Sequence, residues 1–437
     1  MIKGSTGKKE FALLDFALFW LILDLEWVSW IFSQTVFSSV YVVYCSFSIL
    51  FVLFLSVLLN KRIKTSVPVC AVWLPYVLFT IIGYFIGVQF QRMTYWFVFL
   101  VIVLISASSE ILTKIPYRFI LYGGIFSMIG VYVQFLFNSF YTANIKNLFT
   151  YEGINEFVDI TEAFGMNGFT YQQGTTSQLI IFGLVILLFI DKELLPLLLR
   201  KPIIKGLLSC LMVLAIFLTG KRTISAVAVA VPILVFCFSK RRSNNKMAWS
   251  FVIIAVLLIS YFFILPKALQ SNDIFFFKRL SETLEGGSFD EMSSGRDNLW
   301  NLAINAFKEN PLFGIGVGNY PSYSKLGEDA HNTYLQVLCE QGIFLFLFYV
   351  MAILFCLIYT LKLLGKVKDY SLCSFIRVSL AIQLVYISVA ITGNVNVDSM
   401  PAMYFLSMAM IIRVYTLNKV VCKNRFLEKH EAVIPFH

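Results

Sequence analysis

Twelve apolar stretches, each long enough to cross a lipid bilayer, recur along the whole 437-residue chain. A transmembrane helix needs about 20 mostly apolar residues, and we expect spans near 11–31, 37–59, 67–88, 93–109, 117–138, 175–190, 203–220, 222–239, 247–265, 333–361, 373–393 and 400–418. Hydrophobic residues make up 59% of the sequence, against roughly 45–50% in ordinary soluble domains. The sequence therefore predicts an all-α polytopic membrane protein with about 12 transmembrane helices. It excludes a soluble enzyme, a disordered chain and a secreted disulfide scaffold.

The distribution of lysine and arginine orients the predicted spans. When the N-terminus is placed in the cytoplasm, 25 of the 35 Lys and Arg residues fall on the cytoplasmic side, as the positive-inside rule requires. Twelve spans then leave both termini in the cytoplasm, and the net charge of +10 comes from these topology signals. The two long outer loops, 139–174 and 266–332, carry thirteen acidic and seven basic residues. This acidic outer face argues against a nucleic-acid partner, which would need a clustered basic footprint.

The outer loop 266–332 is the largest polar region, and we expect the chemistry there. Irregular polar backbone near a membrane needs protein or water to cover it. We therefore divide the chain into three parts: residues 1–265 with nine spans and the outer loop 139–174, the extracytoplasmic loop 266–332, and residues 333–437 with three spans and a cytoplasmic tail.

Two local patterns organise this extracytoplasmic loop. An apolar stripe predicts a short amphipathic helix, formed by Leu299, Trp300, Ala303, Ile304 and Phe307. Ser293 or Ser294 would cap the helix and Pro311 would end it; it would lie on the membrane, cap a cavity or simply pack within the loop. The glycines of 314–318 follow a helix rather than a strand, so we expect a tight turn that allows close backbone approach instead of a nucleotide-binding loop.

Cations in two outward-facing positions are candidates for anion binding. Lys221 and Arg222 occupy the turn between the seventh and eighth predicted spans. Charges near membrane depth suggest a functional site, unless the side chains simply extend to the interface. Arg296 lies at the start of the predicted loop helix, where free backbone N–H groups and a guanidinium fork both favour an anion. The alternative for Arg296 is a surface salt bridge with Asp290, Glu291 or Asp297.

His331 is the candidate proton acceptor. It is the only histidine outside the C-terminal tail, and it stands just before the tenth predicted span. Histidine is the side chain best suited to accept a proton near neutral pH, although an ordinary interfacial histidine is the alternative. No second His or Cys lies near it in the sequence, so we expect no metal site and no cofactor. Together, Arg222, Arg296 and His331 suit a pyrophosphate-bearing substrate that a sugar hydroxyl attacks.

An ordered set of motifs over about fifty residues resembles the signature of the O-antigen ligase/polymerase superfamily. The motifs are Ser294-Gly295-Arg296-Asp297-Asn298-Leu299-Trp300, Asn310-Pro311-Leu312-Phe313-Gly314-Ile315-Gly316-Val317-Gly318-Asn319-Tyr320, His331-Asn332-Thr333-Tyr334-Leu335-Gln336 and Glu340-Gln341-Gly342-Ile343. Thr219-Gly220-Lys221-Arg222-Thr223 also resembles the family's turn of a small residue, Arg and Ser or Thr. Many members carry an acidic-Pro-Asn element before the sixth span. The corresponding residues 164–174 depart from it, and no role is assigned to them.

The resemblance implies a bacterial glycosyltransferase with a GT-C-like fold at the outer face of the cytoplasmic membrane. Its substrates would be undecaprenyl-pyrophosphate-linked oligosaccharides, and the transfer would be metal-independent and inverting. Arg222 and Arg296 would hold the donor pyrophosphate, and His331 would orient or deprotonate the acceptor hydroxyl. Further substrate-binding candidates are Lys221, Asn332 and Glu340, of which the last two could instead position the loop and the helix.

Within this superfamily we expect a polysaccharide repeat-unit polymerase for O-antigen or capsule. Such an enzyme moves a growing glycan from its lipid pyrophosphate onto the terminal sugar of another lipid-linked unit. The nearest alternative is an O-antigen ligase that transfers finished glycan to lipid A core or another acceptor, because the motifs do not separate the two. A transporter or flippase is disfavoured because no internal repeat is evident. A polymerase would also be expected to work with a separate chain-length regulator.

Overall fold

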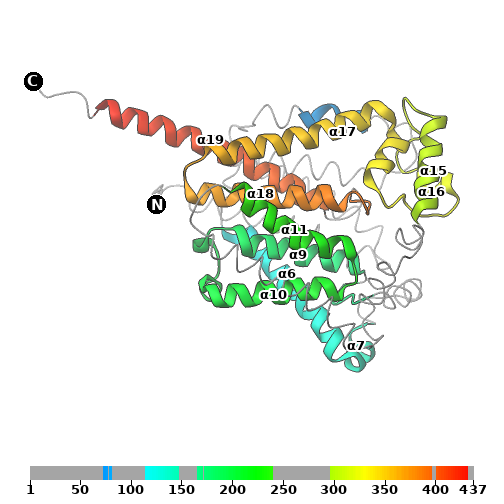
Figure 1. The fold of residues 1–437 in the computed structure, drawn as a ribbon, viewed down its shortest axis with the longest axis horizontal. Helices are drawn as coiled ribbons and strands as arrows, with labels where there is room; N and C mark the ends of the chain where they lie inside the picture. Colours follow the sequence, from blue (N-terminus) through cyan, green and yellow to red (C-terminus); the bar gives the residue numbers. More distant parts are fainter. Residues whose placement is uncertain are drawn as a thin grey trace, which may run out of the picture.

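The computed structural model describes residues 72–76, 78–80, 114–146, 165–170, 172–239, 296–395 and 400–431. Throughout these ranges the chain forms helices and no strand (Figure 1). The longer elements are α6 (Lys114–Leu136), α7 (Asn138–Asn144), α9 (Gln173–Phe189), α10 (Pro202–Leu218), α11 (Arg222–Phe238), α15 (Arg296–Glu309), α16 (Tyr320–Ser324), α17 (Thr333–Lys366), α18 (Tyr370–Val389) and α19 (Met400–Glu431). Two short 3-10 helices, η3 (Lys192–Leu194) and η4 (Leu197–Arg200), connect α9 to α10.

Seven of the predicted spans coincide with described helices, namely α6, α9, α10, α11, α17, α18 and α19. Tyr117–Leu136, Thr333–Lys366 and Tyr370–Val389 are long and apolar enough to cross a bilayer, and α9, α10 and α11 are shorter apolar helices. The prediction of a helical membrane protein is therefore confirmed. The predicted spans 11–31, 37–59, 93–109 and 247–265 lie outside the described residues, as does most of 67–88. The number of twelve spans stays a prediction.

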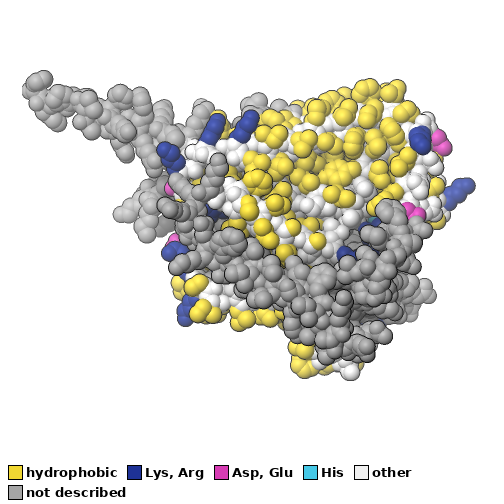
Figure 2. Space-filling model, in the orientation of Figure 1, with side chains coloured by type: hydrophobic (Ala, Val, Ile, Leu, Met, Phe, Trp, Pro, Cys, Tyr) yellow, Lys and Arg dark blue, Asp and Glu magenta, His cyan; other side chains and the backbone are white. Residues whose placement is uncertain are grey.

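Helices α9 and α18 form the core of the bundle. Almost every residue of α9 is buried, and the helix packs against α6, α10, α11 and α18. α18 is buried along most of its length between α9, α11, α17 and α19. A helix that is apolar on every side is stable only inside a larger core or a membrane. The helices around these two expose apolar side chains on their outer faces (Figure 2).

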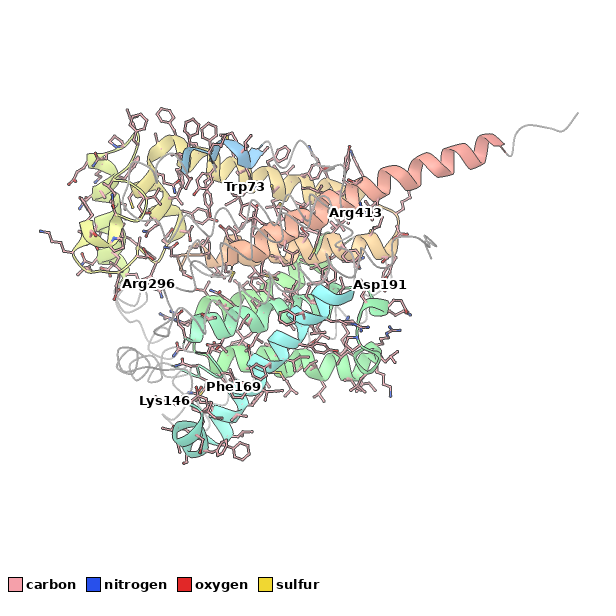
Figure 3. All side chains as sticks on the ribbon, turned by 180° about the vertical axis from the view of Figure 1, so that it is seen from behind. Trp73, Lys146, Phe169, Asp191, Arg296 and Arg413 are labelled. Atoms are coloured by element: carbon pink, nitrogen blue, oxygen red, sulfur yellow. The ribbon has the colours of Figure 1, made fainter. Side chains whose placement is uncertain are left out.

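Because consecutive helices run in opposite directions, their ends gather at two opposite ends of the bundle. One end, which we call the site end, holds the α10–α11 turn, the start of α17 and the loop after α18. Arg296 and Phe169 lie at the site end, whereas Asp191 and Arg413 lie at the opposite or far end (Figure 3). The predicted anion-binding and proton-accepting groups therefore belong to the same end of the molecule.

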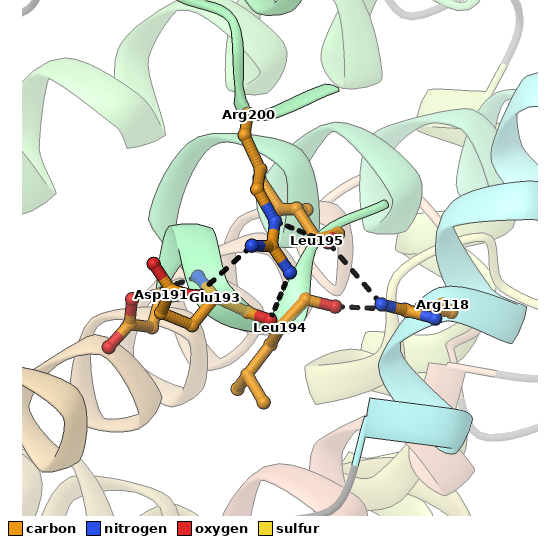
Figure 4. Close-up of polar contacts among 6 residues, drawn as sticks. All are labelled: Arg118, Asp191, Glu193, Leu194, Leu195 and Arg200. Atoms are coloured by element: carbon orange, nitrogen blue, oxygen red, sulfur yellow. Dashed lines mark hydrogen bonds and ion pairs between the residues drawn. The ribbon is translucent and has the colours of Figure 1, made fainter. Parts of the chain in front are cut away.

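At the far end, basic side chains fix the turn between α9 and α10 (Figure 4). Arg118 of α6 donates from Nε to the carbonyl oxygen of Leu194 at 3.0 Å. Arg200 donates to the carbonyl oxygen of Leu195 at 3.1 Å and pairs with the Glu193 carboxylate at 3.1 Å. An exposed ion pair of this kind contributes only about 0–1 kcal/mol. Its main effect is therefore to set the shape of the turn.

Helix α17 is two helices joined at Gly342, whose φ of 75° and ψ of 179° are not helical. In a straight helix the Cα atoms of Tyr334 and Tyr349 would be about 22 Å apart. Their ring centroids are only 6.2 Å apart, which two tyrosine side chains could not achieve from that separation. The first helix therefore folds back beside the second. The predicted span 333–361 is a kinked pair rather than one straight helix.

Helices α15 and α16 pack on the first part of α17 and form a second, smaller core (Figure 1). Its buried members are Leu299, Ala303, Ala306, Tyr320, Ala330 and Cys339. The helix predicted from the apolar stripe is α15, which ends at Glu309, just before Pro311. This prediction is confirmed, while the expected caps Ser293 and Ser294 lie outside the described residues.

Candidate functional site

The α10–α11 turn places Lys221 and Arg222 at the site end. Gly220 has a φ of 72°, a left-handed conformation that glycine adopts without strain, and the chain reverses direction there. α11 begins at Arg222, and its N-cap residue Lys221 provides no side-chain cap. The N–H groups of a first helical turn and the helix dipole favour anions. Two cations and a helix N-terminus thus concentrate positive charge at this turn.

A loop before α9, residues 165–170, packs directly on the α10–α11 turn. The amide of Met166 donates to the carbonyl oxygen of Leu218 at 3.0 Å. Gly165 approaches the turn so closely that a Cβ there would lie 2.3 Å from the carbonyl oxygen of Thr219. Gln134 holds the loop from α6, because its Oε1 accepts from the amide of Gly168 at 2.8 Å. Part of the segment 164–174, to which the motifs assign no role, therefore borders the candidate site.

The loop after α18, residues 390–395, links Arg296 to the start of α11, and we call it the frame loop. Arg296, the first residue of α15, donates from Nη1 to the carbonyl oxygen of Thr392 at 2.6 Å. The hydroxyl of Thr392 donates to Oγ1 of Thr223 at 2.7 Å, and Thr223 directly follows Arg222. Two short hydrogen bonds therefore join three elements that are far apart in the sequence.

The frame loop also fixes the start of α17, next to His331. The amide of Thr333 donates to the carbonyl oxygens of Ala390 at 2.9 Å and Gly393 at 3.1 Å. The hydroxyl of Thr333 donates to the carbonyl oxygen of Gly393 at 2.7 Å and accepts from the amide of Val395 at 2.9 Å. Thr333 is buried, so leaving one of these polar groups unpaired would cost about 1–3 kcal/mol.

His331 precedes α17 in a left-handed backbone conformation with a φ of 49°. Its side chain is 41% exposed, and Nε2 lies 3.8 Å from a carboxylate oxygen of Glu328. Partial burial lowers the pKa of His331 below its usual value, and the charges of Arg296 and Lys221 lower it further, while Glu328 and Asp329 oppose this effect. The net effect favours the neutral imidazole, which is the form that accepts a proton.

The frame loop therefore supports all three predicted catalytic residues, directly or through a nearby residue. Arg296 bonds to the frame loop directly, Arg222 precedes a residue that bonds to it, and His331 lies two residues before another. Two of the alternative salt-bridge partners of Arg296, Asp290 and Glu291, lie outside the described residues. Among the described side chains, no three of His, Cys, Asp or Glu gather as a metal ion would need.

Asn332 and Glu340 both contact the protein's own backbone. Asn332 caps α17, because its Oδ1 accepts from the amide of Leu335 at 3.1 Å. Glu340 is buried, and its Oε1 accepts from the amide of Tyr320 at 3.2 Å and from Nε2 of Gln336 at 2.6 Å. These contacts position the loop and the helix. A direct contact of either side chain with substrate stays a prediction.

The glycine-rich turn after α15 pairs with the kink in α17. The carbonyl oxygens of Cys339 and Glu340 accept from the amides of Ile315 and Gly316, each at 2.9 Å. Gly314 has a φ of 71°, and a Cβ there would lie 2.3 Å from the carbonyl carbon of Glu340. The predicted close backbone approach at this turn is confirmed. It ties the loop that begins with α15 to the helix that follows His331.

Sequence reasoning missed the residues that join these parts, namely Thr223, Gln336 and Thr392. Gln336 holds the loop before α17, because its Oε1 accepts from the amide of Ala330 at 2.7 Å and its Nε2 donates to Asp329 at 3.1 Å. Thr223 and Gln336 lie inside the recognised motifs. For Thr392 the available signal was a Thr-Gly-Asn cluster at the end of the predicted span 373–393.

Fold and site together define a helical membrane protein with cationic groups and a histidine at one end of its bundle. Residues 207–350 match the family model described as O-antigen ligase, which confirms the resemblance to the O-antigen ligase/polymerase superfamily. The match contains Lys221, Arg222, Arg296 and His331. Members are membrane enzymes of the glycosyltransferase type with an O-antigen ligase or polymerase role, and they act on lipid-linked polysaccharides. No curated protein matches the chain significantly.

Proposed function

We propose that the protein is a polysaccharide repeat-unit polymerase for O-antigen or capsule. It transfers a growing glycan from undecaprenyl pyrophosphate onto the terminal sugar of another lipid-linked unit. The observation that carries the proposal is the frame loop, whose hydrogen bonds tie Arg296 to the starts of α11 and α17. A pyrophosphate donor and a hydroxyl acceptor need this combination of cations and a proton acceptor in one place.

In the proposed reaction, the acceptor hydroxyl oxygen attacks the anomeric carbon of the donor sugar. A new C–O bond forms while the bond to the phosphate oxygen breaks, so the configuration inverts and undecaprenyl pyrophosphate leaves. His331 takes the hydroxyl proton, for which its lowered pKa keeps the imidazole neutral. Lys221, Arg222, Arg296 and the N-terminus of α11 stabilise the charge that develops on the leaving group. Because these groups supply the positive charge, the proposed transfer needs no metal ion.

The proposed topology has twelve spans in a GT-C-like arrangement. Both termini are cytoplasmic, and the site lies at the outer face of the bacterial cytoplasmic membrane. A cluster of basic residues at the far end supports this orientation, because the positive-inside rule assigns such residues to the cytoplasm: Arg118, Lys192, Arg200, Lys201, Lys362, Lys366 and Lys368. The proposed division of the chain remains 1–265, 266–332 and 333–437.

An O-antigen ligase is the second candidate function, because the matching family model carries that description. The same arginines and histidine would serve a ligase, since its donor is also a lipid-linked glycan. The two enzymes differ in the acceptor, which is another lipid-linked unit for the polymerase and lipid A core or another molecule for the ligase. The polymerase is also expected to bind a separate chain-length regulator, which co-purification would detect.

Reconstitution of the purified protein with validated cognate lipid-linked repeat units tests the proposal. We expect the wild type to make a ladder of polymers, whereas Arg296→Ala and His331→Ala leave single repeats. Lys325→Ala is the matched control, because Lys325 is an exposed cation just after α16 and should leave the ladder intact. Absence of a wild-type ladder would refute the polymerase proposal. Full ladders from Arg296→Ala and His331→Ala would refute the assignment of these residues to the site.

Glycan analysis of a deletion strain separates the two candidate functions. Loss of a polymerase leaves single repeat units, whereas loss of a ligase leaves long polymer that is not attached to its acceptor. Complementation with the wild type and the three variants at matched expression then assigns the residues in the cell.

A further inference from the structure

A stripe of exposed apolar residues marks the lipid-facing side of α17. The stripe lies on the second helix and recurs every three or four positions: Phe344, Leu347, Met351, Leu354, Phe355 and Ile358. Figure 2 shows this hydrophobic surface over α17. So large an apolar surface on a membrane protein is expected to be covered by lipid.

The length of the helix that carries this stripe matches the thickness of the hydrocarbon core of a bilayer. At the far end, Lys362 and Lys366 are exposed, and lysines at helix ends place their charge at the membrane surface. From Lys362 back to Gly342 the helix rises about 30 Å over 20 positions (362 − 342), at about 1.5 Å per residue. The hydrocarbon core is also about 30 Å thick. The boundary at the site end therefore falls at Gly342, where α17 kinks.

The turn after α15 meets α17 at this boundary. The carbonyl oxygen of Pro311 accepts from the amide of Ile343 at 2.9 Å. The carbonyl oxygen of Leu312 lies so close to Gly342 that a Cβ on the glycine would be 2.2 Å away. The backbone of the turn is thus fixed, yet two of its apolar side chains are exposed. Leu312 is 50% exposed and Phe313 is 78% exposed.

Leu312 and Phe313 form an apolar tip, and polar residues border it on its other side. Lys308, Glu309 and Asn310 precede Pro311 and the tip in the sequence and are exposed. Interfacial anchors combine apolar side chains that reach the acyl chains with charged side chains among the headgroups. The tip has this composition, and it continues the lipid-facing stripe of α17 across the kink.

We propose that Leu312 and Phe313 insert into the membrane leaflet at the site end and contact lipid acyl chains. The partner is the bilayer itself, because the tip adjoins the exposed apolar stripe of α17, which we expect lipid to cover. The contact would hold the C-terminal end of α15 at a fixed height, while Arg296 at its first residue bonds to the frame loop. This inference concerns the membrane contact alone and does not depend on the proposed reaction.

Site-specific photo-crosslinking in the full-length protein tests this contact. A diazirine amino acid is placed at Leu312 or Phe313 in separate variants. Phe344 on the stripe of α17 is the lipid-facing control, and Asn301, an exposed polar position on α15, is the water-facing control. Each variant is reconstituted in vesicles of phosphatidylethanolamine and phosphatidylglycerol without polyprenyl lipid, irradiated, and analysed by mass spectrometry.

We expect phospholipid adducts at Leu312 and Phe313 in yields comparable to Phe344 and about tenfold above Asn301. Yields as low as those at Asn301 would overturn the proposal. Crosslinks from Phe313 to a second copy of the chain would also overturn it, because the tip would then be a protein interface. Only variants that elute and melt like the wild type are compared, and two adjacent positions keep the test available if one variant folds poorly.

Discussion

Two glycines with the same positive φ should respond very differently to alanine. Gly314 and Gly327 both have a φ of 71°. A Cβ at Gly314 would lie 2.3 Å from the carbonyl carbon of Glu340, whereas a Cβ at Gly327 would meet no atom within 4 Å. Gly327→Ala therefore reports the cost of the left-handed conformation alone. Gly314→Ala adds the steric conflict between the glycine-rich turn and α17.

The geometry sets the size of the expected difference. The left-handed conformation costs about 1–2 kcal/mol for a residue with a Cβ, and the lower entropy of the unfolded chain returns about 0.4–1 kcal/mol in both variants. At Gly314 the turn must also move away from α17. This movement breaks two backbone hydrogen bonds of 2.9 Å, which the amides of Ile315 and Gly316 donate to the carbonyl oxygens of Cys339 and Glu340. At about 1–3 kcal/mol for each pair left unsatisfied, Gly314→Ala should cost about 2–6 kcal/mol more than Gly327→Ala.

Unfolding in mixed micelles with increasing sodium dodecyl sulfate, followed by circular dichroism, measures this difference in the free energy of unfolding. Gly314→Ala should also lower transferase activity, because the displaced turn is bonded to the helix that directly follows His331. Gly327→Ala should leave the activity close to that of the wild type. Equal destabilisation by the two substitutions would refute the reasoning, because backbone strain would then explain both.

Three further predictions concern the site. Thr392→Val keeps the carbonyl oxygen that Arg296 binds but removes the hydroxyl that bonds to Thr223. Because the frame loop is then held less firmly, we expect kcat to fall more than KM rises. Thr392→Ser should restore the rate, and equal losses in both variants would contradict a role for the hydroxyl. Glu340→Gln should lower the free energy of unfolding by about 1–3 kcal/mol through the loss of a charged acceptor, and an unchanged midpoint in the micelle assay would contradict it. Burial and the Arg296 and Lys221 charges lower the pKa of His331, so Lys221→Gln should raise that pKa and move the acid limb of the kcat/KM profile to higher pH. An acid limb that stays in place would count against His331 as the base.

Much of the fold was predictable because lipid imposes a strict length and composition on each span. α9, α10 and α11 lie where apolar runs of the required length occur. The kink in α17 was not predictable in the same way. Gly342 lies inside the predicted span 333–361, and the local sequence does not show that its neighbours pair with another segment. The partners of the kink, Pro311 and Leu312, are brought to it only by the tertiary fold.

Only some residues of the candidate site could be predicted from the sequence. Arg222, Arg296 and His331 could be selected from the sequence because a cation or histidine at the edge of an apolar span is locally unusual. Thr392 could not, because a threonine after a span is common. Its importance comes from hydrogen bonds to Arg296 and Thr223, which are 96 and 169 positions away. It also lies outside the matched residues 207–350.

The fold-back of α17 brings the start of this helix onto the frame loop. The ring of Tyr334 lies 6.2 Å from that of Tyr349, although Tyr349 is seven positions beyond the kink at Gly342 (349 − 342). The amide of Thr333 donates to the carbonyl oxygens of Ala390 and Gly393, which follow the last residue of α18, so the start of α17 lies at the site end of the bundle. Non-helical backbone is tolerated there because Thr333 and the frame loop satisfy one another's polar groups. Arg222 and Arg296 are both half-buried, so water screens their charges less than it would on an open surface. In the proposed reaction, the fold-back and the frame loop would therefore strengthen the contact between the arginines and the pyrophosphate.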